Sequence, residues 1–150
     1  MRKFLLIFPL VLIISIKILS AAEFNIDRIQ ITRNGLHQHN FLVELARSDN
    51  ERALGLMFRK ELRENHGMLF IYMNEREVNM WMKNTFISLD MLFLDKHGYI
   101  TRIVRNTEPL SLNIIPSMGN VLGVLELLGG TASRLDIRIG DRVNHSAFSF

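Results

Sequence analysis

Apolar residues along most of this chain recur at the short spacing that is typical of β-strands. Ile29 and Ile31 alternate with polar residues over 27–32, and the segment 41–46 repeats the same pattern. Alternation with a period of two places the apolar side chains on one face of a strand. We therefore predict strands at both segments, each with one face toward a core.

Two other segments are apolar at every position. They span 68–73 and 91–94, and each is bounded by glycine or polar residues. Uninterrupted short apolar runs are typical of strands that are covered on both faces. We expect these two segments to form the centre of a sheet, another strand over 121–127, and a last strand to begin near Arg142.

The polar segments between the strands carry recognisable turn and helix signals. Ser48 and Glu51 have the spacing of a capping box, and Gly55 follows four residues later, which predicts a two-turn helix that ends at Gly55. A second helical turn is expected after Gly129-Gly130, capped by Thr131 and extending through Leu135.

A hairpin turn is expected at 95–98, where Gly98 supplies the positive φ that such turns use. Segments 90–94 and 99–105 should then pair antiparallel. The whole pattern predicts a mainly β fold, namely a compact antiparallel barrel or sandwich of seven to eight short strands with one or two short helices.

The N-terminal residues indicate export. Arg2 and Lys3 precede an uncharged, mostly apolar run, 4–16, and Ser20-Ala21-Ala22 follows it. This is the organisation of a signal peptide, and the 13-residue run is shorter than the about 20 residues of a spanning helix. We expect cleavage after Ala22 and a periplasmic or secreted single domain over 23–150. An uncleaved leader, which Lys17 would favour, is the alternative and would be the only link to a membrane.

Removal of this leader changes the charge of the chain. Three of its 18 basic residues lie in the leader, which leaves 15 basic residues against 15 acidic ones. A neutral domain gives no reason to expect a nucleic-acid partner. The chain has no cysteine, so neither a disulfide nor a lipid-modified cysteine can form.

The segment 80–85 (Met-Trp-Met-Lys-Asn-Thr) holds the only tryptophan and a group of polar residues between two apolar segments. If the segment is extended, Trp81 and Lys83 share one face. Trp81 could then stack on a flat or sugar-like ligand and Lys83 could bind its anionic group, while Asn84 would determine how the chain leaves the strand. The alternative is that Trp81 anchors the core, Lys83 extends to water and Asn84 forms a turn.

Two carboxylates interrupt apolar segments and are candidates for a site. Asp90 and Glu126 could each pair with Lys83, Arg59 or Arg142, since buried carboxylates are rare without a partner. In one reading they line a pocket with Lys83. In the other, Asp90 holds the backbone of the loop 84–88 and Glu126 closes an internal ion pair.

Motifs spread along the chain resemble those of the family catalogued as domain of unknown function 192. They are Gly55-Leu56-Met57-Phe58-Arg59, Gly67-Met68-Leu69-Phe70, Trp81-Met82-Lys83-Asn84-Thr85, Leu89-Asp90, Glu108-Pro109, Val124-Leu125-Glu126-Leu127 and Gly140-Asp141-Arg142-Val143. The resemblance covers about 41–143 and implies a small β-rich domain, bacterial or archaeal and often exported, whose activity is not established. Asp136 stands where the family often has glycine.

Six methionines between Met57 and Met91 raise the hypothesis of a soft-metal site for copper(I). Their positions in predicted strands favour core packing, so we expect no metal and no cofactor. The chain also lacks a phosphate loop, a zinc-protease helix and a nucleophile elbow, and no catalytic residue can be assigned.

The leading hypothesis is an exported, non-enzymatic binding module. Its candidate residues are Trp81, Lys83, Asn84, Arg59, Asp90 and Glu126, and its partner would be a small molecule. A small hydrolase or lyase that uses Lys83 with Asp90 or Glu126 is the first alternative. A domain that docks an envelope protein through an exposed apolar patch around Trp81 is the second.

Export makes a direct prediction about the mature N-terminus. Because the small residues that end the leader are Ala21 and Ala22, the processed protein should begin at Glu23. Mass spectrometry of protein recovered from the export compartment measures this. A different first residue, or a leader that is still attached, contradicts the prediction.

Overall fold

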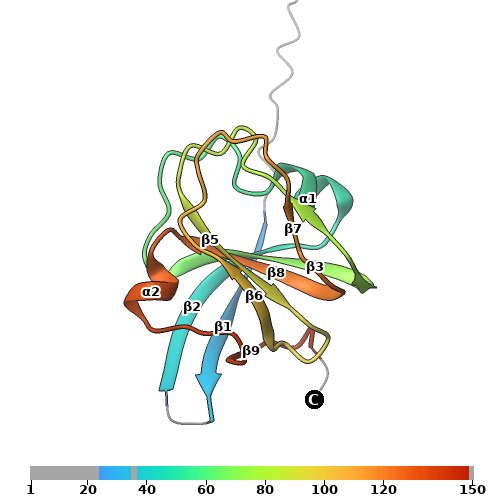
Figure 1. Cartoon of the computed structure of the whole chain (residues 1–150), viewed down its shortest axis with the longest axis vertical. Helices are drawn as coiled ribbons and strands as arrows, with labels where there is room; N and C mark the ends of the chain where they lie inside the picture. The colour runs from blue at the N-terminus through green and yellow to red at the C-terminus, as the bar shows by residue number, and fades with distance from the viewer. Residues whose placement is uncertain (1–23, 35–36, 149–150) are drawn as a thin grey trace, which may run out of the picture.

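A computed structural model describes residues 24–34 and 37–148, and the predicted leader lies outside them. In the described chain, seven strands form one sheet in the order β6-β5-β8-β3-β2-β1-β9, and β4 and β7 form a second (Figure 1). The elements are β1 (Asn25–Arg33), β2 (His37–Ala46), α1 (Asp49–Leu54), β3 (His66–Arg76), β4 (Asn79–Met80), β5 (Leu89–Leu94), β6 (Ile100–Val104), β7 (Ile115–Pro116), β8 (Val121–Leu128), α2 (Thr131–Arg134) and β9 (Arg142–Asn144).

The large sheet is nearly closed into a barrel. Tyr99, just before β6 at one edge, forms an antiparallel bridge with Arg142 of β9 at the other edge. The Ile100 amide donates to the Asp141 carbonyl at 2.8 Å, and the Val143 amide donates to the Gly98 carbonyl at 2.8 Å. These contacts join the two edges, and they confirm the predicted mainly β, barrel-like fold.

One strand pairing differs from the expected antiparallel pattern. β2 and β3 run parallel, with Val43 opposite Gly67 and Leu45 opposite Leu69, whereas the other described pairings are antiparallel. Parallel neighbours cannot be joined by a tight hairpin and need a crossover of about a dozen residues or more. The connection from β2 to β3, which includes α1, provides that crossover.

The predicted turns and first helix form as expected. Ser48 caps α1, its side chain and that of Glu51 make both bonds of the capping box, and Gly55 ends the helix with φ 50°. In the hairpin between β5 and β6, Gly98 has φ 81° and Asp95 accepts two backbone amides of the turn. Glycine is required at Gly98, because a Cβ there would lie 2.4 Å from the Val143 carbonyl oxygen.

The second helix begins differently from the prediction. Gly130, with φ 86°, occupies the N-cap position of α2, and Thr131 is the first helical residue. After the helix, Asp136 has φ 53°, a conformation that suits glycine. Its carboxylate binds Arg33 and Arg138, which offsets the strain at this position. Neither helix in the described part of the chain is long and apolar enough to cross a membrane.

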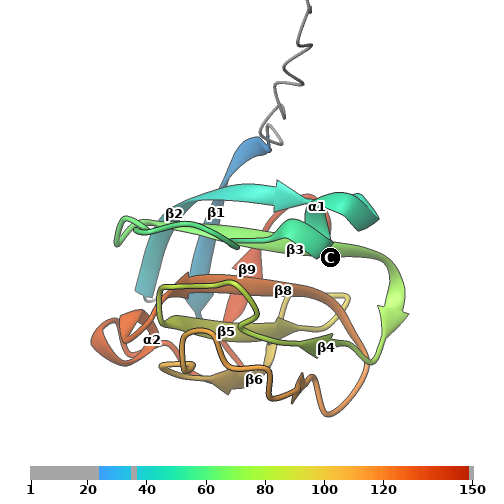
Figure 2. The same ribbon diagram turned by 90° about the horizontal axis from the view of Figure 1, so that it is seen from above.

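The central strands are covered on both faces, as their continuous apolar sequences predict. All six residues of β5 are buried. One apolar cluster, which includes Leu69, Leu92 and Leu125, fills the barrel interior, whereas a second, which includes Met68 and Met91, lies on the outer face. Figure 2 shows β8 between β3 on one side and β5 and β6 on the other, with α1 and β4 toward one end.

Asp90 fixes the loops at one end of the central strands. Its side chain is fully buried and accepts the backbone amides of Asn106 at 2.8 Å, Gly130 at 3.1 Å and Ala132 at 2.7 Å. Asp90 therefore ties β5 to the loop after β6 and to the start of α2. The expectations that it lines a pocket or holds the loop 84–88 are both wrong.

Replacement of Asp90 by asparagine should destabilise the fold. In Asp90→Asn, an amide NH₂ would face the Ala132 amide where a carboxylate oxygen now accepts it, so a buried donor loses its acceptor. We expect the free energy of unfolding to fall by about 2 to 4 kcal/mol, measured by denaturant unfolding. Asp95→Asn is the matched control, because asparagine also serves in an exposed turn. Equal losses in the two variants would contradict the assignment.

Candidate functional site

A cavity of about 430 Å³ lies on the outer face of the sheet, between α1, the end of β3 and β8. Polar and aromatic side chains of distant segments converge on it. Those that line it are Asp49, Arg52, Tyr72, Arg76, Glu77, Asn79, Trp81, Thr85 and Glu126, with Leu54, Leu56, Met57, Phe70, Val78 and Met80 among the apolar ones.

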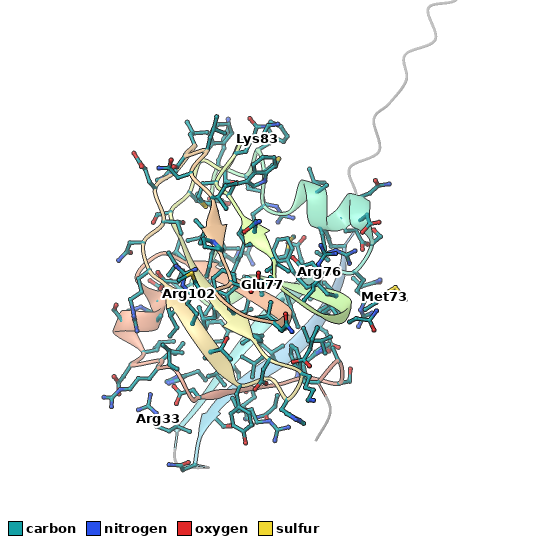
Figure 3. The ribbon with its side chains drawn as sticks, turned by 45° about the vertical axis from the view of Figure 1, so that its right-hand side comes forward. Arg33, Met73, Arg76, Glu77, Lys83 and Arg102 are labelled. Atoms are coloured by element: carbon teal, nitrogen blue, oxygen red, sulfur yellow. The ribbon has the colours of Figure 1, made fainter. Side chains whose placement is uncertain are left out.

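An irregularity in β3 opens this space. β3 pairs regularly with β8 from Gly67 to Ile71, and the register then shifts before Arg76 pairs with Val121. Extra residues in one strand bend it away from its partner, and here the strand leaves the outer face partly uncovered. In Figure 3, Met73 projects outward from this segment, and it is 93% exposed.

Glu126 is the most unusual group of the cavity. In the sheet it lies between Met68 of β3 and Met91 of β5, and it is only 4% exposed. Among the described residues no hydrogen bond or ion pair to its carboxyl is found. Burial among apolar neighbours raises the pKa of Glu126 to about 8. The internal ion pair that was one alternative for Glu126 is thus not formed.

Tyr72 and Arg52 form one wall of the cavity. The Arg52 guanidinium lies 5.1 Å from the centre of the Tyr72 ring and donates to the Ile71 carbonyl at 2.9 Å and to the Asp49 carboxylate at 2.5 Å. Burial raises the pKa of the Tyr72 hydroxyl, Arg52 opposes this rise and the Glu126 carboxylate adds to it. The Arg52 guanidinium is therefore engaged by groups of the protein itself, whereas the Glu126 carboxyl has no such partner among the described residues and remains available to a ligand.

Trp81 lies at the rim of the cavity. It is 46% exposed, and the Lys83 ammonium lies 5.1 Å from its ring centre. Only Asn79–Met80 form a strand, yet the expected alternation holds, because Met80 and Met82 are buried while Trp81 and Lys83 are exposed. The hypothesis that Trp81 anchors the core is wrong.

The other predicted site residues lie outside the cavity. Asn84 has φ 55°, and its carbonyl accepts the Phe58 amide at 2.8 Å. Arg59 makes a bidentate pair with Glu44, at 2.6 and 2.5 Å. Neither residue lines the cavity, so the cavity does not bring them together with Glu126.

The constellation proposed for a hydrolase or lyase is not assembled. Lys83 stacks on Trp81 outside the cavity, Asp90 is engaged by three backbone amides, and Arg142 donates to the His97 carbonyl at 2.9 Å. An acid and base pair must lie within hydrogen-bond reach of the same substrate. Lys83 and Asp90 do not meet that requirement with Glu126.

The methionines pack mainly in the outer core. Met68, Met80, Met82 and Met91 are buried in the outer apolar cluster, whereas Met73 is exposed, contrary to the expectation of a core position. Within residues 24–34 and 37–148, no group of three or more histidine, aspartate or glutamate side chains is placed to hold a metal ion.

Sequence reasoning missed Tyr72, Arg52, Arg76 and Glu77. One signal was available for Tyr72, because alternation along β3 places it on the same face as Phe70 and Met68. Nothing in the sequence marked the other three residues, because their positions depend on the register shift in β3 and on how α1 packs against the sheet.

Two solved structures resemble this fold closely. A protein from Sinorhizobium meliloti 1021, described as a candidate transcription regulator, is 39% identical with a TM-score of 0.83, and the match covers 85% of this chain and 99% of that one. A protein of unknown function from Novosphingobium aromaticivorans DSM 12444 is 36% identical with a TM-score of 0.80, and the match covers 84% of this chain and 89% of that one. No curated protein matches the chain.

A family model for uncharacterised proteins matches residues 29–145. This range includes the segment 41–143 in which the motifs were recognised, and it extends from the middle of β1 to just past the end of β9. The matched range holds Glu126, Trp81 and all the other cavity residues. The chain therefore belongs to the uncharacterised family named domain of unknown function 192.

Proposed function

We propose that this protein is an exported binding domain for a small polar molecule, which it holds in the cavity between α1, β3 and β8. The single observation that carries the proposal is Glu126, a buried carboxyl with no partner among the described residues, facing a cavity large enough for a small ligand. Isolated buried carboxyls are costly to a fold and are rarely kept without a use.

The protonation of Glu126 indicates which ligand groups fit. With a pKa of about 8, the carboxyl is mostly protonated at neutral pH and can donate one hydrogen bond while it accepts another. Trp81 offers a flat apolar face at the rim, and Tyr72 and Asn79 add polar atoms. This combination suits a neutral ligand that is rich in hydroxyl or carbonyl groups, such as a sugar or a peptidoglycan fragment.

Location and charge support this reading over a role on DNA. The Sinorhizobium relative is described as a candidate transcription regulator. In this chain the proposed leader directs the protein out of the cytoplasm, and residues 23–150 carry equal numbers of basic and acidic residues. DNA binding draws on an excess of basic residues on the protein, which the processed chain lacks.

A thermal-shift screen of the processed protein tests the site. Sugars, nucleotides, peptidoglycan fragments and metal ions are the probes, since a ligand that binds the native state raises its melting temperature. We expect Trp81→Ala and Glu126→Ala to weaken any hit about fivefold or more, because each removes a contact worth about 1 kcal/mol or more.

Matched variants make this screen decisive. Phe86 has an exposed fraction of 49%, similar to the 46% of Trp81, but it does not line the cavity. Phe86→Ala should therefore leave the thermal shift unchanged. Glu126→Gln resembles the protonated acid and should retain much of the binding that Glu126→Ala loses. A ligand whose shift survives both Trp81→Ala and Glu126→Ala would show that the cavity is not the site. A shift produced only by copper(I) would replace the proposal with a metal site.

Glu126 should also make the stability of the ligand-free protein depend on pH. Its pKa is about 8 in the folded protein, against 4.5 for an exposed glutamate, so the folded state binds more protons between these limits. Its contribution to stability is complete below about pH 4.5 and is lost as pH rises toward about 8. Over that window the loss is at most about 4 to 5 kcal/mol.

Denaturant unfolding of the protein and of Glu126→Gln at several pH values measures this effect. Other titrating groups are common to both proteins, so the difference in unfolding free energy isolates Glu126. We expect Glu126→Gln to become relatively more stable as pH rises. A difference that stays constant from pH 4.5 to 8 would contradict the raised pKa.

A further inference from the structure

Exposed apolar side chains are concentrated on three loops at one end of the molecule. The loop surface, as we name it, comprises Phe58, Trp81, Phe86, Leu110 and Leu112, whose exposed fractions lie between 46% and 67%. They make up five of the 11 large apolar side chains that are exposed in the described chain. In Figure 3, Lys83, which lies on the same loop as Trp81, is at the opposite end of the molecule from Arg33.

Backbone hydrogen bonds join these loops into one unit. The Phe58 amide donates to the Asn84 carbonyl at 2.8 Å, the Leu110 amide to the Thr85 carbonyl at 3.0 Å, and the Met82 amide to the Ser111 carbonyl at 3.1 Å. The segment 82–85 therefore stands between the other two loops and holds both. The apolar side chains are displayed on a defined framework.

Two of these residues occupy a strained conformation. Phe58 has φ 65° and Leu110 has φ 63°, a region that bulky residues rarely adopt and that asparagine or glycine tolerates. Both side chains are mostly exposed, so packing in the core does not explain the choice of residue. Strain that is kept without a gain in folding stability is characteristic of functional surfaces.

The first described residue lies close to one loop of this surface. Phe24, the first described residue, lies under the Arg59 guanidinium, which is 5.9 Å from its ring centre. The segment that precedes it in sequence contains the apolar run 4–16. Arg59 follows Phe58 in the sequence, so Phe24 lies at the end of the molecule that carries the loop surface.

We propose that the loop surface docks onto a lipid bilayer, with its apolar side chains in the interfacial layer and Lys83 among the headgroups. Tryptophan and lysine beside aliphatic and aromatic residues have the composition of an interfacial contact. Exposed Lys60 and Lys83 are balanced by exposed Glu61 and Glu108, so apolar insertion supplies the affinity and anionic lipid is not essential.

This inference rests on the proposed export. The loop surface shares Trp81 with the ligand cavity, whereas Phe58, Phe86, Leu110 and Leu112 do not line it. Whether the leader is cleaved or retained, the domain would work beside a membrane. The expectation that only an uncleaved leader links the protein to a membrane would then be replaced. An envelope protein as the partner of the same surface is the competing occupant.

Vesicle flotation with the processed protein tests the proposal, after mass measurement shows that the leader is absent. We expect the protein to float with vesicles of phosphatidylethanolamine and phosphatidylglycerol, and with phosphatidylcholine alone. Trp81 is the only tryptophan in the chain, so its emission should shift to shorter wavelength as the loop surface enters the bilayer.

A double variant separates docking from folding. Phe58→Asn with Leu110→Asn removes two apolar side chains at positions where asparagine tolerates the backbone, so the melting temperature should be unchanged or higher. Vesicle partitioning should fall at least about tenfold. Ile139→Asn is the control, because Ile139 is 64% exposed and lies beside Arg138 and Asp141 near Arg33, away from the loop surface.

Three results would overturn the proposal. They are the absence of flotation, flotation that survives the double variant, and binding to native membranes but not to vesicles of lipid alone, which would assign the surface to a protein partner. Phe58 and Leu110 do not line the cavity, so a ligand shift that persists in the double variant distinguishes this outcome from a failure of the binding site.

Discussion

The structure depends on the need to cover its central strands on both faces. β5, β8 and the segment 68–73 of β3 are apolar at nearly every position, and closing the sheet into a barrel buries only one of their faces. The outer face must be covered by α1, by the small β4–β7 sheet and by the loops between them. These short segments cover an area that a long helix would cover in other folds, and they leave a cavity where β3 bends away from β8.

This constraint also explains why two glutamates on the outer face have different roles. Glu44 and Glu126 both lie beside Met68, on the strands to either side of it. The loop after α1 brings Arg59 to Glu44, and a bidentate ion pair forms. Within the described chain no cation is brought to Glu126, and the cavity lies above it instead. Whether a carboxyl at the centre of a strand forms an internal ion pair or stays open to a ligand therefore depends on the loop that passes over it.

The sequence predicted the features that depend on neighbouring residues. The capping box of Ser48 and Glu51, the turn at Gly98 and the double burial of β5 need only local spacing, and each forms as expected. The parallel pairing of β2 with β3 and the contact between Arg59 and Glu44 join residues that are distant in sequence. Similarly, Asp90 looked like a site residue because it is polar in an apolar strand. Its three amide partners come from loops whose positions only the closed barrel determines.

The residues with positive φ differ in whether their side chains suit this backbone conformation. Asn34, Asn84, Asn106 and Asp136 have side chains suited to this region, and Asp136 gains two arginine partners. Of the other three, Met118 lies outside the loop surface, and Phe58 and Leu110 have no such compensation, because their side chains extend into solvent. Asparagine at either position would relieve strain and remove exposed apolar surface together, so folding stability alone would favour it. The retention of phenylalanine and leucine therefore argues that their side chains serve a contact outside the folded domain.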